Sequence, residues 1–138
     1  MSAHWLLKTE PSTYSFERLL KDGRTVWDGV RNNLALMHMR AMKTDDQVLI
    51  YHSGSAKSVV GIGRVARPAY PDPKLEDPKI VVIDVVPDRR LPSPIPLSAI
   101  KAEKDLADLP LVLMPRLSVM PVSPEQWKRI LTLAEAAV

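Results

Sequence analysis

The sequence contains no cysteine, which excludes disulfides, thiolate metal sites and cysteine nucleophiles. Its three histidines, His4, His38 and His52, lack the spacing of metal ligands. The stretch Gly61-Ile62-Gly63 lacks the third glycine of a phosphate-binding loop and opens no helix. We therefore expect neither a metal site nor a bound cofactor.

Long apolar runs are also absent, because no stretch approaches the ~18–20 residues needed to span a bilayer. The first five residues, Met1 to Trp5, do not show the basic region and apolar stretch of a signal peptide. The sequence therefore predicts a soluble protein with no membrane partner. We expect it to be a cytoplasmic monomer.

Dense charge of one sign is missing, since no block of five or six like charges occurs. Nineteen Lys and Arg against sixteen Asp and Glu give a formal charge of +3. A protein that grips long duplexes mainly by counterion release needs denser positive charge. One nucleotide held in a pocket would need far less.

What the chain does have is enough apolar content for a core: 46% of its 138 residues are hydrophobic. Its thirteen prolines lie in loops between periodic segments, and neither a repeat nor a linker is visible. We predict one α+β domain over residues 1–138, with strands curled into a barrel-like sheet surrounded by helices.

The hydrophobic pattern predicts strands at residues 4–9, 25–27, 47–53, 59–67, 80–86 and 118–120, and helices at residues 16–21, at 33–42 and from 124 onward. We expect helix 33–42 to be largely buried, because its apolar residues spread around most of its circumference. The proline-rich stretches 68–78 and 87–96 indicate loops, and residues 97–109 indicate a weakly helical surface segment. Gly61 and Gly63 share a strand face and predict a groove that a helix, a backbone or a ligand approaches closely.

The segment Trp27-Asp28-Gly29-Val30-Arg31-Asn32 is the most distinctive in the chain. Trp27 offers a flat face for stacking and its neighbours offer hydrogen bonds, which suits a planar nucleobase. Alternatively, the segment is a helix-leading turn in which Trp27 is core and Asp28 or Asn32 caps the next helix. Arg116 could bind a phosphate or pair with Asp28 inside the fold.

Polar residues at strand ends are further candidates. Lys8 and Glu10 are two residues apart, so on a strand they point the same way and could bind a polar ligand. They could equally form a surface ion pair of little energetic value. Tyr51 and Ser53 share a strand face and offer hydroxyls, while His52 faces the other way and is expected to be structural.

In order along the chain, several motifs resemble those of the EVE domain family, which is related to PUA, YTH and ASCH domains. The matching stretches are Trp5-Leu6-Leu7-Lys8-Thr9-Glu10-Pro11, Trp27 to Asn32, Met42-Lys43-Thr44-Asp45-Asp46, Tyr51-His52-Ser53, Ala69-Tyr70-Pro71-Asp72-Pro73 and Arg116-Leu117-Ser118-Val119-Met120-Pro121. The resemblance implies a PUA-like pseudo-barrel. It also implies a non-catalytic reader of nucleic acid, DNA or RNA, that takes a modified base such as 5-methyl- or 5-hydroxymethylcytosine into an aromatic-walled pocket.

On that basis, ten residues would surround one ligand-binding site: Lys8, Glu10, Trp27, Val30, Arg31, Asn32, Tyr51, Ser53, Arg116 and Ser118. Trp27 would be the stacking wall. A flipped base costs a few kcal/mol to unstack, and stacking on an aromatic returns ~1–3 kcal/mol.

The chain departs from the family pattern at three places. Thr9 stands where a serine is usual, Met120 replaces a usual glutamine, and Asn33-Leu34-Ala35-Leu36-Met37 replaces an aromatic followed by Gln-Ala-Arg-Asn. We therefore expect a more apolar pocket than is typical.

Two other functions remain open. The related ASCH domains include amidohydrolases that act on acylated cytidine with lysine, threonine and glutamate, and Lys8, Thr9 and Glu10 are the right types. Strand alternation places Thr9 on the face opposite its two partners, which counts against a joint active site. The third possibility is a protein-interaction module with an exposed apolar patch.

Overall fold

The computed structural model describes residues 3–136, which form a mixed six-stranded sheet with helices at both of its ends. The strands are β1 (His4–Thr9), β2 (Thr25–Trp27), β3 (Gln47–His52), β4 (Ser58–Pro71), β5 (Val81–Pro96) and β6 (Val119–Val122). The helices are α1 (Phe16–Asp22), α2 (Asn33–Ala41), α3 (Leu97–Lys101), the 3₁₀ helix η1 (Lys104–Leu106), α4 (Pro110–Leu113) and α5 (Pro124–Ala136).

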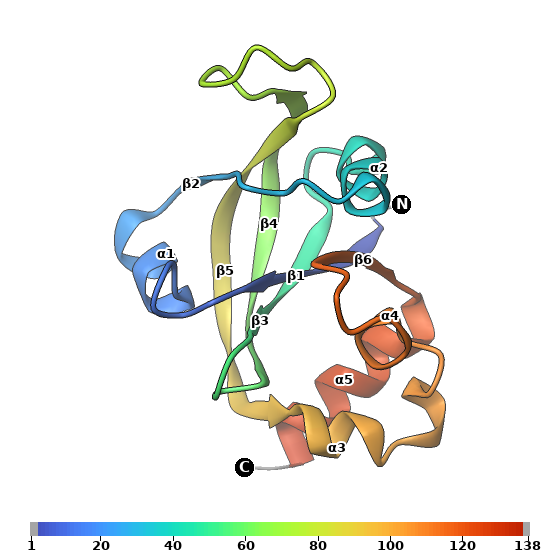
Figure 1. Cartoon of the computed structure of the whole chain (residues 1–138). Helices are drawn as coiled ribbons and strands as arrows, with labels where there is room; N and C mark the ends of the chain where they lie inside the picture. Colours follow the sequence, from blue (N-terminus) through green and yellow to red (C-terminus); the bar gives the residue numbers. More distant parts are fainter. Residues whose placement is uncertain (1–2, 137–138) are drawn as a thin grey trace.

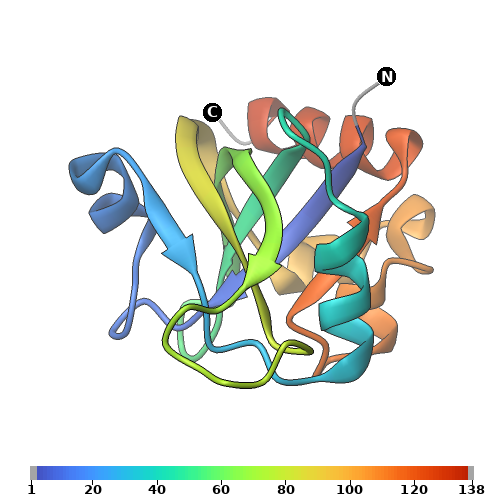
Figure 2. The same cartoon turned by 90° about the horizontal axis from the view of Figure 1, so that it is seen from above.

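The sheet has the strand order β2-β5-β4-β3-β1-β6, in which β1 and β3 are parallel and every other pair is antiparallel. The predicted α+β class is confirmed, although the sheet does not close into a barrel, because β2 and β6 remain at opposite edges. Seen from above, α1 lies at one end of the sheet, and α2 and the C-terminal helices lie at the other (Figure 2).

The hairpin of β4 and β5 is longer than the sequence predicted, and it runs through the height of the molecule (Figure 1). β4 continues to Pro71, so the predicted loop at residues 68–78 is wrong over its first four residues. β3 pairs with β4 only as far as Arg64. Beyond this point one edge of β4 has no strand partner, and Pro68 and Pro71 are tolerated there although they lack an N–H.

The predicted loop at residues 87–96 is also wrong, because β5 continues to Pro96. The pairing of β2 with β5 ends at Val85, so the rest of β5 is bonded to β4 alone. Register shifts in that stretch leave Pro92 and Pro94 outside the paired positions. A proline pattern typical of a loop is therefore compatible with a strand where an edge is open or the ladder is interrupted.

Helix α1 approaches β4 closely at Gly61, whereas the other strand glycine, Gly63, lies against Val85 and Val86 of β5 and Val48 of β3. Ser15 caps its start by accepting from the Arg18 N–H, and Gly23 ends it with φ of 76°. The Phe16 ring lies against Gly61, where an added Cβ would come within 2.4 Å of a ring carbon. The close approach at Gly61 is therefore made by a helix residue.

Helix α2 is buried on one side only, which corrects the prediction that it is largely buried. Ala35, Leu36 and Met39 are buried, whereas the Met37 side chain is 52% exposed. Only one face of α2 packs against the sheet, so apolar residues on its other face remain in solvent.

The C-terminal part confirms the predicted closing strand and final helix. Ser123 and Gln126 cap α5 reciprocally, and Trp127 is buried with its ring centroid 4.3 Å from that of His4. The segment 97–109 is helical in short pieces and mostly exposed, as expected, although Ile100, Leu106 and Leu109 are buried in the core. Within residues 3–136, no helix has both the length and the apolar character needed to cross a membrane.

Candidate functional site

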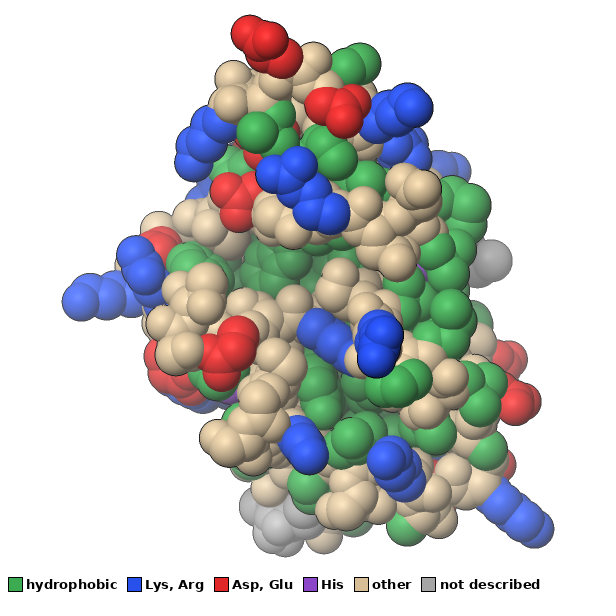
Figure 3. All heavy atoms as spheres, in the orientation of Figure 1, with side chains coloured by type: hydrophobic (Ala, Val, Ile, Leu, Met, Phe, Trp, Pro, Cys, Tyr) green, Lys and Arg blue, Asp and Glu red, His purple; other side chains and the backbone are tan. Residues whose placement is uncertain are grey.

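A cavity of about 630 Å³ opens where the end of β1 faces β2 and the segment after it. We call it the main cavity. Its lining residues come from five stretches of chain: Lys8, Thr9, Glu10, Thr13, Tyr14, Thr25, Val26, Trp27, Asp28, Gly29, Val30, Lys74 and Ser118. The face of the molecule in Figure 3 is hollowed near its middle, and hydrophobic side chains form the floor of the hollow with charged ones around it. The volume lies within the usual range for small-ligand sites.

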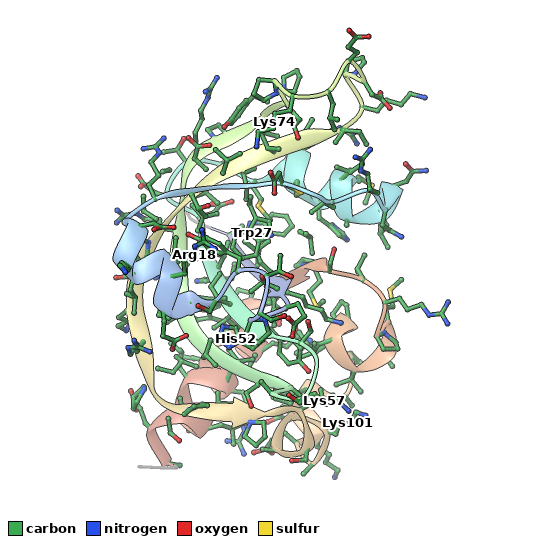
Figure 4. The ribbon with its side chains drawn as sticks, turned by 60° about the vertical axis from the view of Figure 1, so that its left-hand side comes forward. Arg18, Trp27, His52, Lys57, Lys74 and Lys101 are labelled. Atoms are coloured by element: carbon green, nitrogen blue, oxygen red, sulfur yellow. The ribbon has the colours of Figure 1, made fainter. Side chains whose placement is uncertain are left out.

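Trp27 forms the aromatic wall of the main cavity. Its backbone is held by pairing with Ile83 of β5, and its ring meets Tyr14 edge-on at a centroid distance of 6.3 Å. The residue is 7% exposed, so most of the indole is packed and little freedom remains to it. Figure 4 shows Trp27 in the interior, below Lys74 of the β4–β5 loop.

The chain turns sharply after Trp27. Gly29 has φ of 78°, a left-handed conformation that side chains rarely adopt. The turn leaves Asp28 exposed and returns Val30 to a buried position in the cavity wall. The Asp28 carboxylate lies 4.0 Å from the Lys74 ammonium, an exposed pair of little energetic value.

Lys8 is the most constrained cation of the cavity. Its Nζ donates a hydrogen bond of 2.7 Å to the Pro115 carbonyl and lies 5.8 Å from the centre of the Tyr51 ring. Partial burial lowers the pKa of Lys8. Tyr51 itself is buried and supports Lys8 from below, and burial raises the pKa of its hydroxyl.

Glu10 and Thr9 take part in local hydrogen bonds. The Glu10 carboxylate accepts from the backbone N–H and the hydroxyl of Ser12, and these bonds lower its pKa. The Thr9 hydroxyl donates to the Tyr14 carbonyl at 2.7 Å. No ion pair joins Lys8 to Glu10 within residues 3–136, so the surface-pair alternative is not observed.

Thr9 was expected to face away from Lys8 and Glu10, yet all three residues line the main cavity. β1 ends at Thr9, so strand alternation still applies to Lys8 and Thr9, whereas Glu10 lies outside the strand and does not follow it.

The ten residues predicted for one site are divided by the structure. Lys8, Glu10, Trp27, Val30 and Ser118 line the main cavity. Asn32 and Arg116 line a second hollow of about 370 Å³, which we call the side hollow. Arg31 is exposed in the chain between the two, Tyr51 lies beneath Lys8, and Ser53 lines neither but donates its N–H to the Thr9 carbonyl.

The side hollow is lined by residues of α2, of α4 and of the segment after it: Asn32, Leu34, Leu113, Met114, Pro115, Arg116 and Leu117. Asn32 caps α2, because its side-chain oxygen accepts from the Ala35 N–H at 3.0 Å. Two alternatives were open for residues 27–32, and features of both are observed. Trp27 is packed and Asn32 caps α2, and Trp27 also lines the main cavity. Arg116 does not pair with Asp28.

Several lining residues were missed from the sequence, chiefly Tyr14 and Lys74. Lys74 directly follows the motif Ala69 to Pro73, to which no role was given, and Asp72 of that motif accepts from the Lys74 N–H. Its place directly after this motif was the feature of the sequence that could have identified Lys74. Tyr14 precedes the cap of α1 and had no comparable signal.

His52 has the structural role expected of it. Its Nε2 accepts a hydrogen bond of 3.0 Å from the Phe16 N–H, so the ring is neutral in this arrangement. Burial lowers the pKa of His52, against the opposing influence of Glu17 and Glu10. Within the described part of the chain, no three His, Asp or Glu residues are placed to hold a metal ion.

Comparison with known proteins gives close relatives over almost the whole chain. The model of the EVE domain matches residues 3–133. Mouse thymocyte nuclear protein 1 is 31% identical, and the match covers 98% of this chain and 75% of the relative.

Solved structures agree with this match. A protein from Rhodopseudomonas palustris, solved by NMR, is 41% identical with a TM-score of 0.92, over 99% of this chain and 95% of that one. Human thymocyte nuclear protein 1, solved in complex with DNA containing 5-methylcytosine, is 30% identical with a TM-score of 0.90, over 97% of this chain and 98% of that one. An ASCH protein from Zymomonas mobilis is 11% identical with a TM-score of 0.62, a likeness of fold alone.

Proposed function

Because the chain belongs to the EVE domain family, we propose that it binds nucleic acid and reads a modified cytosine in the main cavity without catalysing a reaction. The observation that carries this proposal is the packed indole of Trp27 in the wall of a cavity of about 630 Å³. The human relative that is solved with 5-methylcytosine DNA supports the choice of base.

The lining supplies the two kinds of contact that a flipped base needs. The Trp27 ring offers a stacking face, worth ~1–3 kcal/mol per base, which offsets part of the cost of extruding the base. Glu10, Asp28 and Ser118 offer acceptors and a hydroxyl for the base edge, with Lys8 as a donor.

Discrimination of the methyl group rests on apolar contact. Val30 is the buried aliphatic residue of the wall, and the turn at Gly29 returns it to the cavity that Trp27 lines. One methyl group in an apolar niche contributes only ~1–3 kcal/mol, so we expect a preference for the modified base of about tenfold rather than absolute selectivity.

The proposal is tested by the affinities of matched oligonucleotides with cytosine, 5-methylcytosine or 5-hydroxymethylcytosine at one position, measured by fluorescence anisotropy. Trp27→Leu keeps an apolar side chain but removes the aromatic face, and should weaken binding of the preferred oligonucleotide by about tenfold or more. Trp27→Phe keeps a flat face and should lose much less. Equal affinity of the wild type for all three oligonucleotides contradicts the proposal.

A second candidate is an amidohydrolase acting on acylated cytidine, and it is favoured by one observation. Lys8, Thr9 and Glu10 line the same cavity, and burial lowers the pKa of Lys8. Against it, the Thr9 hydroxyl donates to the Tyr14 carbonyl and is engaged away from a substrate, and the Lys8 ammonium already uses one of its three donors on the Pro115 carbonyl. Turnover of N4-acetylcytidine that disappears in Lys8→Ala would establish the enzyme in place of the reader.

A further inference from the structure

The side hollow combines exposed apolar side chains with a free cation. Leu113 and Met114 are 62% and 44% exposed, and Leu34 and the buried Leu117 complete the apolar part of the lining. Arg116 lies on the same hollow, and no acidic residue lines it. Within residues 3–136, neither Arg116 nor Arg31 forms an ion pair.

The side hollow and the main cavity share a wall. Lys8 lines the main cavity, and its Nζ is 2.7 Å from the carbonyl of Pro115, which lines the side hollow. The consecutive residues Leu117 and Ser118 line the side hollow and the main cavity respectively. Consecutive Cα atoms are about 3.8 Å apart, so the two spaces adjoin.

The chemistry of the side hollow favours the face of a base over a peptide. A peptide backbone would need hydrogen-bond partners at regular intervals. The one side-chain amide of the lining, that of Asn32, already uses its oxygen to cap α2. Apolar walls beside an arginine instead match a nucleotide, whose base has apolar faces and whose sugar carries a phosphate.

We infer that the side hollow accepts the base of the nucleotide next to the modified one in the same strand, with Arg116 and Arg31 at the phosphate between them. This inference rests on the proposed function, because it needs a base in the main cavity to bring the strand to this surface. The volume of about 370 Å³ is sufficient for one planar base. The domain then reads two adjacent nucleotides through two adjoining spaces.

The test asks whether removing one base from the oligonucleotide still lowers affinity when the apolar walls of the side hollow have been shortened. Oligonucleotides carry one 5-methylcytosine and an abasic site either immediately 5′ or immediately 3′ of it. Their affinities are measured for the wild type and for the double variant Leu113→Ala with Met114→Ala, two exposed positions where shortening leaves the core intact. Met37→Ala removes a similarly exposed side chain that lines neither space, and it is the matched control.

The abasic site on one side should weaken wild-type binding by about fivefold, and this loss should vanish in the double variant but persist in Met37→Ala. If the abasic site lowers affinity equally in all three proteins and the preference for 5-methylcytosine is retained, this inference is overturned and the proposed function stands. A wild type without that preference overturns the proposed function itself. If the wild type and Met37→Ala are dimers, the double variant is a monomer, and the abasic site has the same effect on affinity in all three, then a second copy of the chain covers the side hollow instead.

Discussion

At the scale of single residues, the buried carboxylate of Asp46 secures the start of the sheet. Asp46 is 2% exposed and accepts hydrogen bonds from the Trp5 indole N–H, from the Lys43 N–H and from the Ala3 N–H, each between 2.9 and 3.0 Å. The sequence places Asp46 in a family motif but gives no reason for it. The structure supplies one, because three donors converge on a single side chain.

Asp46→Ala should therefore lower the free energy of unfolding by about 2–4 kcal/mol, since buried donors are left without an acceptor. Chemical denaturation followed by circular dichroism measures the change. Asp105→Ala, at an exposed carboxylate, is the control and should change stability by less than about 0.5 kcal/mol. A loss at Asp46 no greater than that of the control contradicts this role.

His52 gives a prediction of pH dependence. Because burial lowers its pKa in the fold, stability is complete above the ordinary value of about 6.5 and declines as the pH falls below it, where only the unfolded chain takes up the proton. In His52→Gln an amide oxygen can accept from the Phe16 N–H at every pH. The variant should lose less stability than the wild type between pH 6.5 and 5, as measured by thermal unfolding. If both proteins lose the same stability between pH 6.5 and 5, His52 is not the group responsible.

At the scale of elements, the contact between α1 and β4 determines one side of the main cavity. The Phe16 ring fills the space above Gly61, and Tyr14, two residues before it, lies in the cavity wall. Two glycines on one strand face predicted a close approach correctly. Which element approaches could not be predicted, because this depends on the path of the chain between β1 and β2.

Gly61→Ala should move α1 outward and lower the free energy of unfolding by about 1–3 kcal/mol, because the added methyl would overlap the Phe16 ring. Adding Phe16→Leu to this variant should recover part of the loss if the overlap is its cause. Thermal unfolding of the single and double variants measures this. A double variant whose loss is the sum of the two single losses would exclude a shared contact.

The long strands β4 and β5 show why local patterns failed elsewhere. Proline at positions 87, 92, 94 and 96 indicates a loop by local chemistry. Whether a strand tolerates proline depends on which of its edges is paired, which is a property of the sheet and not of the segment. The same holds for α2, whose exposed Met37 face is a consequence of packing on one side only.

At the scale of the whole molecule, the order of motifs along the chain predicted the family and the fold class, because both depend on the entire pattern. It did not predict that ten candidate residues divide between two adjoining spaces, since Asn32 and Arg116 meet only through the placement of α2 beside α4. Lys74 reaches the main cavity from the β4–β5 loop and was missed for the same reason.

The low net charge of the molecule predicts a shallow salt dependence of binding. A formal charge of +3 and few free cations near the cavities indicate contact with about two or three phosphates. Arg116→Gln should therefore flatten the plot of log affinity against log salt by about 0.7–0.9, the contribution of one phosphate. Lys101→Gln removes the same charge at the end of the molecule away from Lys74 and Trp27 (Figure 4), and should leave the slope unchanged. Equal slopes for both variants and the wild type would exclude a phosphate contact at Arg116.

Binding of a modified base in the main cavity can be observed at Trp27 itself. The chain has three tryptophans, and their indole N–H groups can be followed separately by NMR. The Trp5 group is bonded to Asp46 and Trp127 packs on His4, so neither should respond. An oligonucleotide with one 5-methylcytosine should shift the Trp27 signal saturably, at lower concentrations than its unmodified counterpart. Saturable binding that leaves the Trp27 signal unchanged would show that the modified base does not lie against this ring.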